Sequence, residues 1–220
     1  MAISEQDRQP LRSQEVSDGL PDGWRLLLGQ VVVRYATGDF TTGARLVKRV
    51  AELADEADHH PDVDLRYPHV TVGLSSHDVG AVTRRDLRLA AAIAAAATEL
   101  GVEPGQVPDT LELALDTADQ DRVAPFYAAL LGYDRSSPDD VVDPGSRGPS
   151  VWFQHSDSSE AGRQCWHLDV RVPHDQAEDR LRAVLGAGGR LVDDERAPAF
   201  WVVEDPEGNR SCITTWQARD

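Results

Sequence analysis

The stretch of residues 101–109 divides this chain into two parts. It contains two glycines and two prolines and follows neither helical nor strand periodicity. Such a composition is typical of a segment that joins two domains. A chain of 220 residues is long enough for two domains of ordinary size. We therefore expect a first domain over residues 1–104, a linker over 105–109 and a second domain over 110–220.

The first part alternates between helix and strand patterns. Apolar spacing and turn residues predict a helix over 13–20, strands over 24–28 and 31–36, a helix over 40–57, a strand over 65–74 and a helix over 83–100. Thr83 and Asp86 have the spacing of a capping box at the start of the last helix. The predicted fold class is α+β, with an antiparallel sheet and two long helices on one face.

Three histidines flank the strand predicted over residues 65–74. His59 and His60 are adjacent and are followed by Pro61, while His77 comes just after the strand. Adjacent side chains face one pocket only where the chain turns, and a proline favours such a turn. Histidine has an unperturbed pKa near neutrality, so it both takes and gives protons there. The pattern therefore indicates a proton-transfer site.

In order and spacing this stretch resembles the pterin-4a-carbinolamine dehydratase family. The matching residues are Asp58-His59-His60-Pro61, Tyr67, Val70-Thr71-Val72-Gly73-Leu74, Ser75-Ser76-His77-Asp78 and Thr83-Arg84-Arg85-Asp86. The resemblance covers roughly residues 12–101. Thr37, Ala44 and Val63 depart from the family pattern, because aromatic residues usually stand there.

The resemblance implies that this part dehydrates 4a-hydroxytetrahydropterin to quinonoid dihydropterin. One proton leaves a ring nitrogen and another is given to the departing hydroxyl, so no metal or redox cofactor is required. The implied proton-transfer residues are His59, His60 and His77. Which of them acts as the acid stays open.

Three carboxylates near these histidines are candidates for orienting them or the substrate: Asp58, Asp78 and Asp86. Asp58 fits equally well as an ordinary solvated acid. Asp86 fits better as a helix cap, because it is the third residue after Thr83. His69 lies on the polar face of its predicted strand and is expected to face solvent.

The second part repeats one order of elements. The first copy has a strand over 111–116, a helix over 119–131 and a strand over 150–154; the second has a strand over 166–172, a helix over 174–185 and strands over 200–203 and 210–215. This order indicates a weak internal duplication. It resembles the glyoxalase-like members of the vicinal oxygen chelate superfamily, over roughly residues 110–216, which implies a paired βαβββ module.

The residues that carry this second resemblance are Asp119 with the run 126–132, His167-Leu168-Asp169-Val170, Leu185-Gly186-Ala187 and the run 205–209. Metal-using members place ligands on the first and last strand of each repeat. By register those positions hold Glu112, His167 and Cys212, and the cysteine replaces the usual glutamate. We interpret this as a degenerate ligand set and expect no catalytic metal. His167 is expected to be a core or pocket histidine.

Charge and cysteine content limit the partners and the cellular location that we expect for this chain. The net charge is −16 and no block is rich in Lys or Arg, which argues against nucleic acid and anionic membranes. Only two cysteines occur, and neither a signal peptide nor a membrane-spanning run is recognisable, so a cytoplasmic location is expected. We expect a pterin substrate, an unknown small ligand for the second domain and a homo-oligomer.

Two alternatives to a dehydratase stay open. In the first alternative, the chain is a non-catalytic binding or dimerisation protein. In the second, the C-terminal half is the enzyme, as a metal-dependent lyase or dioxygenase. A pterin turnover assay tests the first alternative, and metal analysis of the purified protein tests the second.

Overall fold

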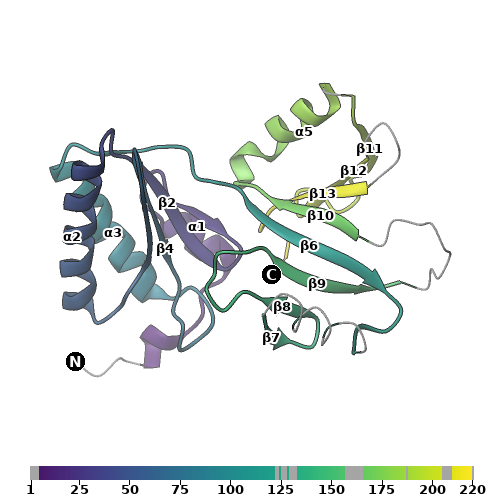
Figure 1. The fold of residues 1–220 in the computed structure, drawn as a ribbon, viewed down its shortest axis with the longest axis horizontal. Helices are drawn as coiled ribbons and strands as arrows, with labels where there is room; N and C mark the ends of the chain where they lie inside the picture. Colours follow the sequence, from purple (N-terminus) through teal and green to yellow (C-terminus); the bar gives the residue numbers. More distant parts are fainter. Residues whose placement is uncertain are drawn as a thin grey trace. The chain divides into compact units, whose positions relative to one another are not determined.

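The computed structural model describes residues 5–121, 124, 128, 133–156, 166–186, 188–204 and 210–219. The chain divides into two compact units, the first ending at Pro108 and the second spanning Asp109–Ala218. Each unit has its own sheet and its own helices (Figure 1). Within the described residues, no helix is long and apolar enough to cross a membrane.

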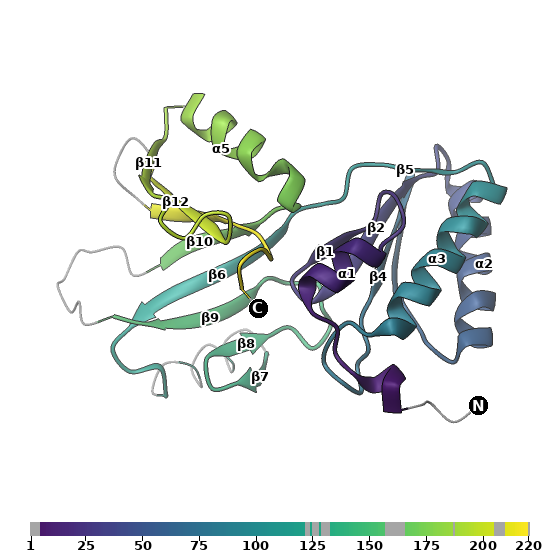
Figure 2. The same cartoon turned by 180° about the vertical axis from the view of Figure 1, so that it is seen from behind.

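The first unit is an antiparallel sheet with two long helices on one face. It begins with the short helix η1 (Glu5–Arg8) and helix α1 (Ser13–Gly19). The sheet has the order β1-β2-β4-β3, made of β1 (Arg25–Leu27), β2 (Gln30–Ala36), β4 (His69–Leu74) and β3 (Asp62–Arg66). Helices α2 (Phe40–Ala57) and α3 (Arg84–Glu99) lie side by side over it (Figures 1 and 2). The predicted α+β class and pair of helices are confirmed.

Strand alternation forms the core of this unit. Every second residue of the two central strands is at most 1% exposed, namely Val31, Val33, Tyr35, Val70, Val72 and Leu74. Helix α2 packs onto this layer with Leu46, Val50 and Ala54 at helical spacing. Gly43 lies on the same helix face, where an added Cβ would be 2.6 Å from Leu65 Cδ1. A side chain at this position would have to displace the end of the Leu65 side chain, so glycine eases the close approach of the helix to the sheet.

The single strand predicted over residues 65–74 is wrong. The structure has a hairpin there, in which β3 and β4 pair with Arg66 opposite His69 and the chain reverses at Tyr67-Pro68. Proline carries no N–H for a sheet ladder and is common in turns. The Pro68 carbonyl instead accepts hydrogen bonds from the N–H groups of residues 37 and 38, at 2.9 and 3.1 Å. Strand β3 thereby becomes an edge of the sheet.

Much of the stretch predicted to be a linker is attached to the first unit. Strand β5 (Glu103–Pro104) pairs with β2, and the N–H of Gly105 donates to the carbonyl of Arg34 at 2.6 Å. Val102 and Val107 are each only 4% exposed. The boundary between the units falls between Pro108 and Asp109.

The second unit is one mixed sheet of eight strands in the order β11-β12-β13-β10-β6-β9-β8-β7. Its strands are β6 (Thr110–Thr117), β7 (Asp134–Ser137), β8 (Asp140–Val142), β9 (Ser150–His155), β10 (Trp166–Arg171), β11 (Arg190–Asp193), β12 (Phe200–Glu204) and β13 (Arg210–Thr214). In each half the first strand pairs in parallel with the last, and the other two strands follow outward. This repeated order confirms the predicted paired module.

The helices of the second unit are only partly described. The short helix η2 (His174–Gln176) and helix α5 (Ala177–Gly186) follow β10, where one helix was predicted. The helix predicted over 119–131 lies largely outside the described residues, as do the matched positions 126, 127, 187 and 205–209. Strands β7, β8 and β11 were not predicted.

The two faces of this sheet differ in character. One face is apolar: Leu115, Val151 and Phe153 form a buried cluster in the first half, while Val203 and Ile213 form another with Ala177 of α5 in the second half. Because side chains alternate along a strand, the residues in between face the other way. Those positions include Glu112, Asp116, His167, Asp169 and Cys212, so the opposite face is polar at the centre of the sheet.

We expect residues 1–108 to fold without the second unit, because the sheet, both long helices and the β5 attachment all lie within them. A fragment ending at residue 104 should be less stable by about 0.5–1.5 kcal/mol, since it lacks the hydrogen bond from Gly105 to Arg34. Urea unfolding of the two fragments measures the difference. Equal stability of both would show that residues 105–108 contribute nothing to this unit.

Candidate functional site

The end of helix α2 directs His59 into the protein. Asp58 adopts the left-handed conformation, with φ 49°, and its N–H bonds back to the last turn of the helix. The N–H of His59 then donates to the carbonyl of Ala54 at 3.1 Å. This reversal resembles a common way to end a helix. It leaves His59 only 6% exposed, although the residues on both sides of it are exposed.

Asp86 holds His59 from the opposite side. This aspartate is the third residue of α3 and is fully buried. Its Oδ1 lies 2.7 Å from Nε2 of His59. Its Oδ2 accepts hydrogen bonds from Ser76 Oγ at 2.8 Å and from the N–H and Oγ1 of Thr83 at 2.7 and 3.2 Å. One carboxylate therefore joins a loop, the end of strand β4 and the start of helix α3.

The hydrogen bonds decide the charge of Asp86. Burial by itself would raise the pKa of this carboxyl, but the hydrogen bonds from His59, the Thr83 N–H and Ser76 outweigh burial and hold the pKa below its ordinary value. Asp86 is thus ionised near neutral pH and can only accept hydrogen bonds. It follows that Nε2 of His59 carries the hydrogen in their bond. Nδ1 is then the nitrogen that can take up or release a proton.

The other two predicted histidines are exposed. Nε2 of His60 lies 3.2 Å from Oδ1 of Asp55, and both side chains are largely in solvent. His77 is exposed in the turn after β4, directly after the fully buried Ser76. The structure therefore brings His59 and Asp86 together and places His77 one residue from their network. His60 instead forms its hydrogen bond with Asp55 of helix α2.

The predicted carboxylates take different places. Asp58 is exposed at the end of α2. Asp78 accepts a hydrogen bond from Arg85 at 2.6 Å, which lowers the pKa of Asp78. Asp86 completes the capping box, as predicted, and in addition binds His59. His69, expected to face solvent, is half-buried.

Sequence reasoning assigned no role to Ser76 or Arg85. Ser76 is fully buried, and its hydroxyl contacts both Thr83 Oγ1 and Asp86 Oδ2 at 2.8 Å. Arg85 is 8% exposed and reaches Asp78. A small polar residue that continues the buried phase of an alternating strand was the available signal for Ser76.

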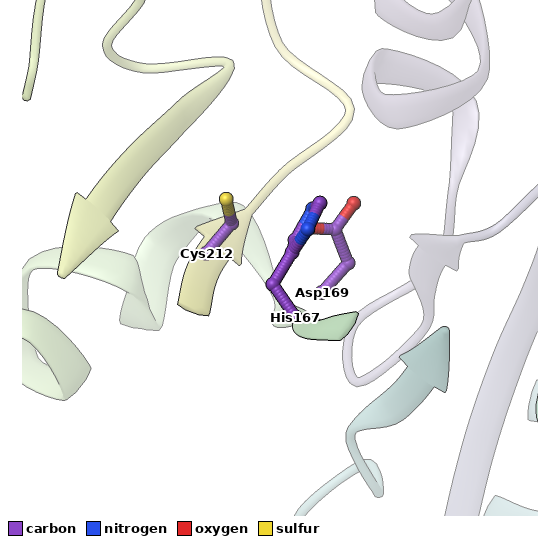
Figure 3. Close-up of side chains that lie close together, drawn as sticks. All are labelled: His167, Asp169 and Cys212. Atoms are coloured by element: carbon purple, nitrogen blue, oxygen red, sulfur yellow. The ribbon is translucent and has the colours of Figure 1, made fainter. Parts of the chain in front are cut away.

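A second cluster of polar side chains lies on the central strands of the second unit. His167 and Asp169 are two residues apart on β10, and Asp169 is directly opposite Cys212 on the parallel strand β13. The three therefore share one face of the sheet, and Figure 3 shows their side chains pointing to the same side. One ligand atom from each lies within 4.8 Å of the others.

The structure groups a different carboxylate with His167 and Cys212 than the one that register suggested. Glu112 is opposite Asp169 on β6, but its carboxylate binds Arg171 at 2.8 Å and accepts a hydrogen bond from Ser150 at 3.3 Å. Arg171 lies two residues beyond Asp169 on the same face and draws Glu112 away by charge attraction. The carboxylate that lies beside His167 and Cys212 is that of Asp169.

Comparison with known proteins gives two family matches. A family model described as Pterin 4 alpha carbinolamine dehydratase matches residues 9–96, and one described as Glyoxalase-like domain matches residues 112–214.

Individual relatives match the first unit. A protein of Herpetosiphon aurantiacus named "Putative pterin-4-alpha-carbinolamine dehydratase" is 41% identical over 68 residues, which cover 31% of this chain and 71% of the relative. A protein of the same name from Chloroflexus aurantiacus is 40% identical over 86 residues, which cover 38% of this chain and 91% of the relative. A crystal structure titled as a transcriptional coactivator/pterin dehydratase from Brucella melitensis is 27% identical, with a TM-score of 0.38, and the match covers 40% of this chain and 97% of that one.

We expect Asp86→Asn to destabilise the chain by roughly 2–4 kcal/mol near neutral pH, because it weakens a helix cap and a charged hydrogen bond. The stability that the carboxylate supplies is present above about pH 4 and is lost as the pH falls through its lowered folded-state pKa. The variant should therefore lose less stability than the parent chain on acidification. Urea unfolding over a pH series measures both effects.

Asp78→Asn is the matched control, because it removes an exposed carboxylate near the same helix start. It should change the pH dependence less than Asp86→Asn does. Parallel pH curves for Asp86→Asn and the parent chain would contradict the role given to Asp86.

Proposed function

The chain belongs, through residues 9–96, to the pterin-4a-carbinolamine dehydratase family, and we propose that its first unit dehydrates 4a-hydroxytetrahydropterin to quinonoid dihydropterin. The observation that supports this proposal most directly is the buried pair of His59 and Asp86. Buried titratable groups held against a specific charge partner cluster at functional sites, where they serve as acids and bases. The second unit is accessory in this proposal and binds a separate small ligand.

The reaction needs two proton transfers. A base removes the proton from a ring nitrogen, the C4a–O bond breaks, and an acid protonates the departing hydroxyl so that it leaves as water. No electrons are exchanged with a partner. Groups with pKa values near neutrality suit both transfers, and each contributes typically 10²–10⁴-fold.

His59 is suited to one of these transfers because it is held in place. Asp86 fixes Nε2–H and stabilises the positive charge that forms when Nδ1 takes a proton. Fixing the ring also fixes the direction of Nδ1. The entropic cost of aligning Nδ1 with a substrate is therefore lower. The further bonds from Ser76 and Thr83 keep the carboxylate from turning away.

The second transfer belongs to His60 and His77 in this proposal. Both side chains are exposed, so they can exchange protons with solvent and return to their starting state after each turnover. Which of the two gives the proton to the hydroxyl is left open. The general test is turnover of a 4a-hydroxytetrahydropterin by the full chain; a rate equal to that in buffer, with folded protein, would reject the proposal.

We expect His59→Gln to lower turnover by at least about 100-fold. The glutamine amide can donate to Asp86 from nearly the position of Nε2, so the variant keeps the hydrogen bond but loses the proton-transfer group. His69→Gln is the control, because His69 lies on strand β4 outside the Asp86 network, and it should retain near-normal turnover. If the control lost activity and His59→Gln kept it, the assignment would be wrong.

We expect His60→Ala and His77→Ala each to lower turnover by at least about tenfold, because each removes an exposed proton-transfer group. Steady-state kinetics with circular dichroism as a check of folding measures this. The fragment 1–108 should also turn over the substrate, and the two substitutions should lower its turnover in the same way, since all three histidines lie within it. An inactive but folded fragment would mean that the second unit contributes to the site.

A further inference from the structure

We propose that His167, Asp169 and Cys212 of the second unit bind a divalent cation of the zinc class. The proposal is independent of dehydratase activity, because all three residues lie in the C-terminal sheet. They come from two adjacent parallel strands of the second repeat, β10 and β13. Figure 3 shows the imidazole, carboxylate and thiol groups on the same side of that sheet.

The spacing of the three groups suits one ion. Nε2 of His167 and Oδ1 of Asp169 are 3.7 Å apart. Two nitrogen or oxygen ligands of a tetrahedral zinc ion are separated by roughly 3.4 Å, given metal–ligand distances near 2.1 Å. All three ligand atoms lie within 4.8 Å of one another. Small rotations of side chains, without movement of the strands, would therefore close the cluster around an ion.

The carboxylate of Asp169 supplies independent support for a bound cation. The residue is only 7% exposed, and its Oδ1 is buried without a hydrogen-bond partner among the described residues. Leaving a buried carboxylate oxygen unsatisfied is costly, so native proteins rarely do so without a reason. A cation bound next to His167 would satisfy this atom directly.

The surroundings favour a positive ion as well. Nδ1 of His167 lies 3.7 Å from Oδ1 of Asp116, another buried oxygen without a hydrogen-bond partner in the described chain. Metal-binding histidines usually direct their second nitrogen to such a carboxylate, which orients the ring. Arg171 is already paired with Glu112, so it does not offset the charges of Asp116 and Asp169.

The mixture of donor atoms selects the kind of ion. Nitrogen, oxygen and sulfur donors together suit zinc and related transition metals, whereas magnesium and calcium prefer oxygen alone. Three protein ligands leave a fourth position open for water or a ligand atom. The expectation of no metal rested on the cysteine in place of the usual glutamate and on the lack of a second histidine. In the structure Asp169 lies beside His167 and Cys212, so three potential ligands lie together in one repeat.

The test is metal binding by the purified full chain, loaded with zinc after chelator treatment and measured by equilibrium dialysis with elemental analysis. We expect close to one zinc ion per chain. Cys212→Ser and Asp169→Asn should each weaken binding by at least about tenfold. Cobalt in place of zinc should give thiolate-to-metal charge-transfer absorption, and Cys212→Ser should abolish that absorption.

Two controls separate this ligand set from others. Ser211→Ala changes the neighbour of Cys212 on the opposite face of β13, and Glu112→Gln removes the carboxylate paired with Arg171. Ser211→Ala should bind zinc like the parent chain. Glu112→Gln takes the charged partner from Arg171 beside Asp169, so it should weaken zinc binding, but less than Asp169→Asn does. Zinc should raise the melting temperature of Ser211→Ala by more than that of Cys212→Ser. Binding well below one ion per chain, or binding lost in Glu112→Gln and kept in Asp169→Asn, would overturn the proposal.

Discussion

The first unit depends on one buried negative charge. Asp86 accepts four hydrogen bonds, and its donors come from the loop after α2, the end of β4 and the cap of α3. An ionised carboxylate without such partners would be expensive to bury. The three segments must therefore meet at one point, which fixes the packing of both long helices against the sheet and the direction of His59 at the same time.

This shared anchor explains why the three histidines differ in their surroundings. His59 is bound to the anchor and is buried, whereas His60 and His77 are exposed in segments next to it. A fixed group is suited to a transfer that needs accurate alignment, and an exposed group is suited to exchange with solvent. The chain turns at Asp58, whose backbone is in the left-handed conformation. This turn directs only one residue of the His-His pair, His59, into the protein.

Local patterns predicted the long elements of the fold, because their signals lie within a few residues. Helix α2 begins and ends where predicted, with Asp39 as its cap. The hairpin was missed because apolar residues continue on both sides of Tyr67-Pro68, and β7 was missed because its sequence, Asp134 to Ser137, carries no apolar alternation. The bond between His59 and Asp86 spans 27 residues, so only the fold could reveal it.

In the second unit, register predicted which residues share a face but not which charges pair. Glu112 and Asp169 are direct neighbours across two strands, and Arg171 decides between them by binding Glu112. Both units contain a buried aspartate beside a histidine, but the two aspartates differ in their hydrogen bonds. Both oxygens of Asp86 are satisfied by protein donors, so that carboxylate completes a structure. Oδ1 of Asp169 has no such donor among the described residues, so the same physical rule that explains the first site supports the cation proposed at the second.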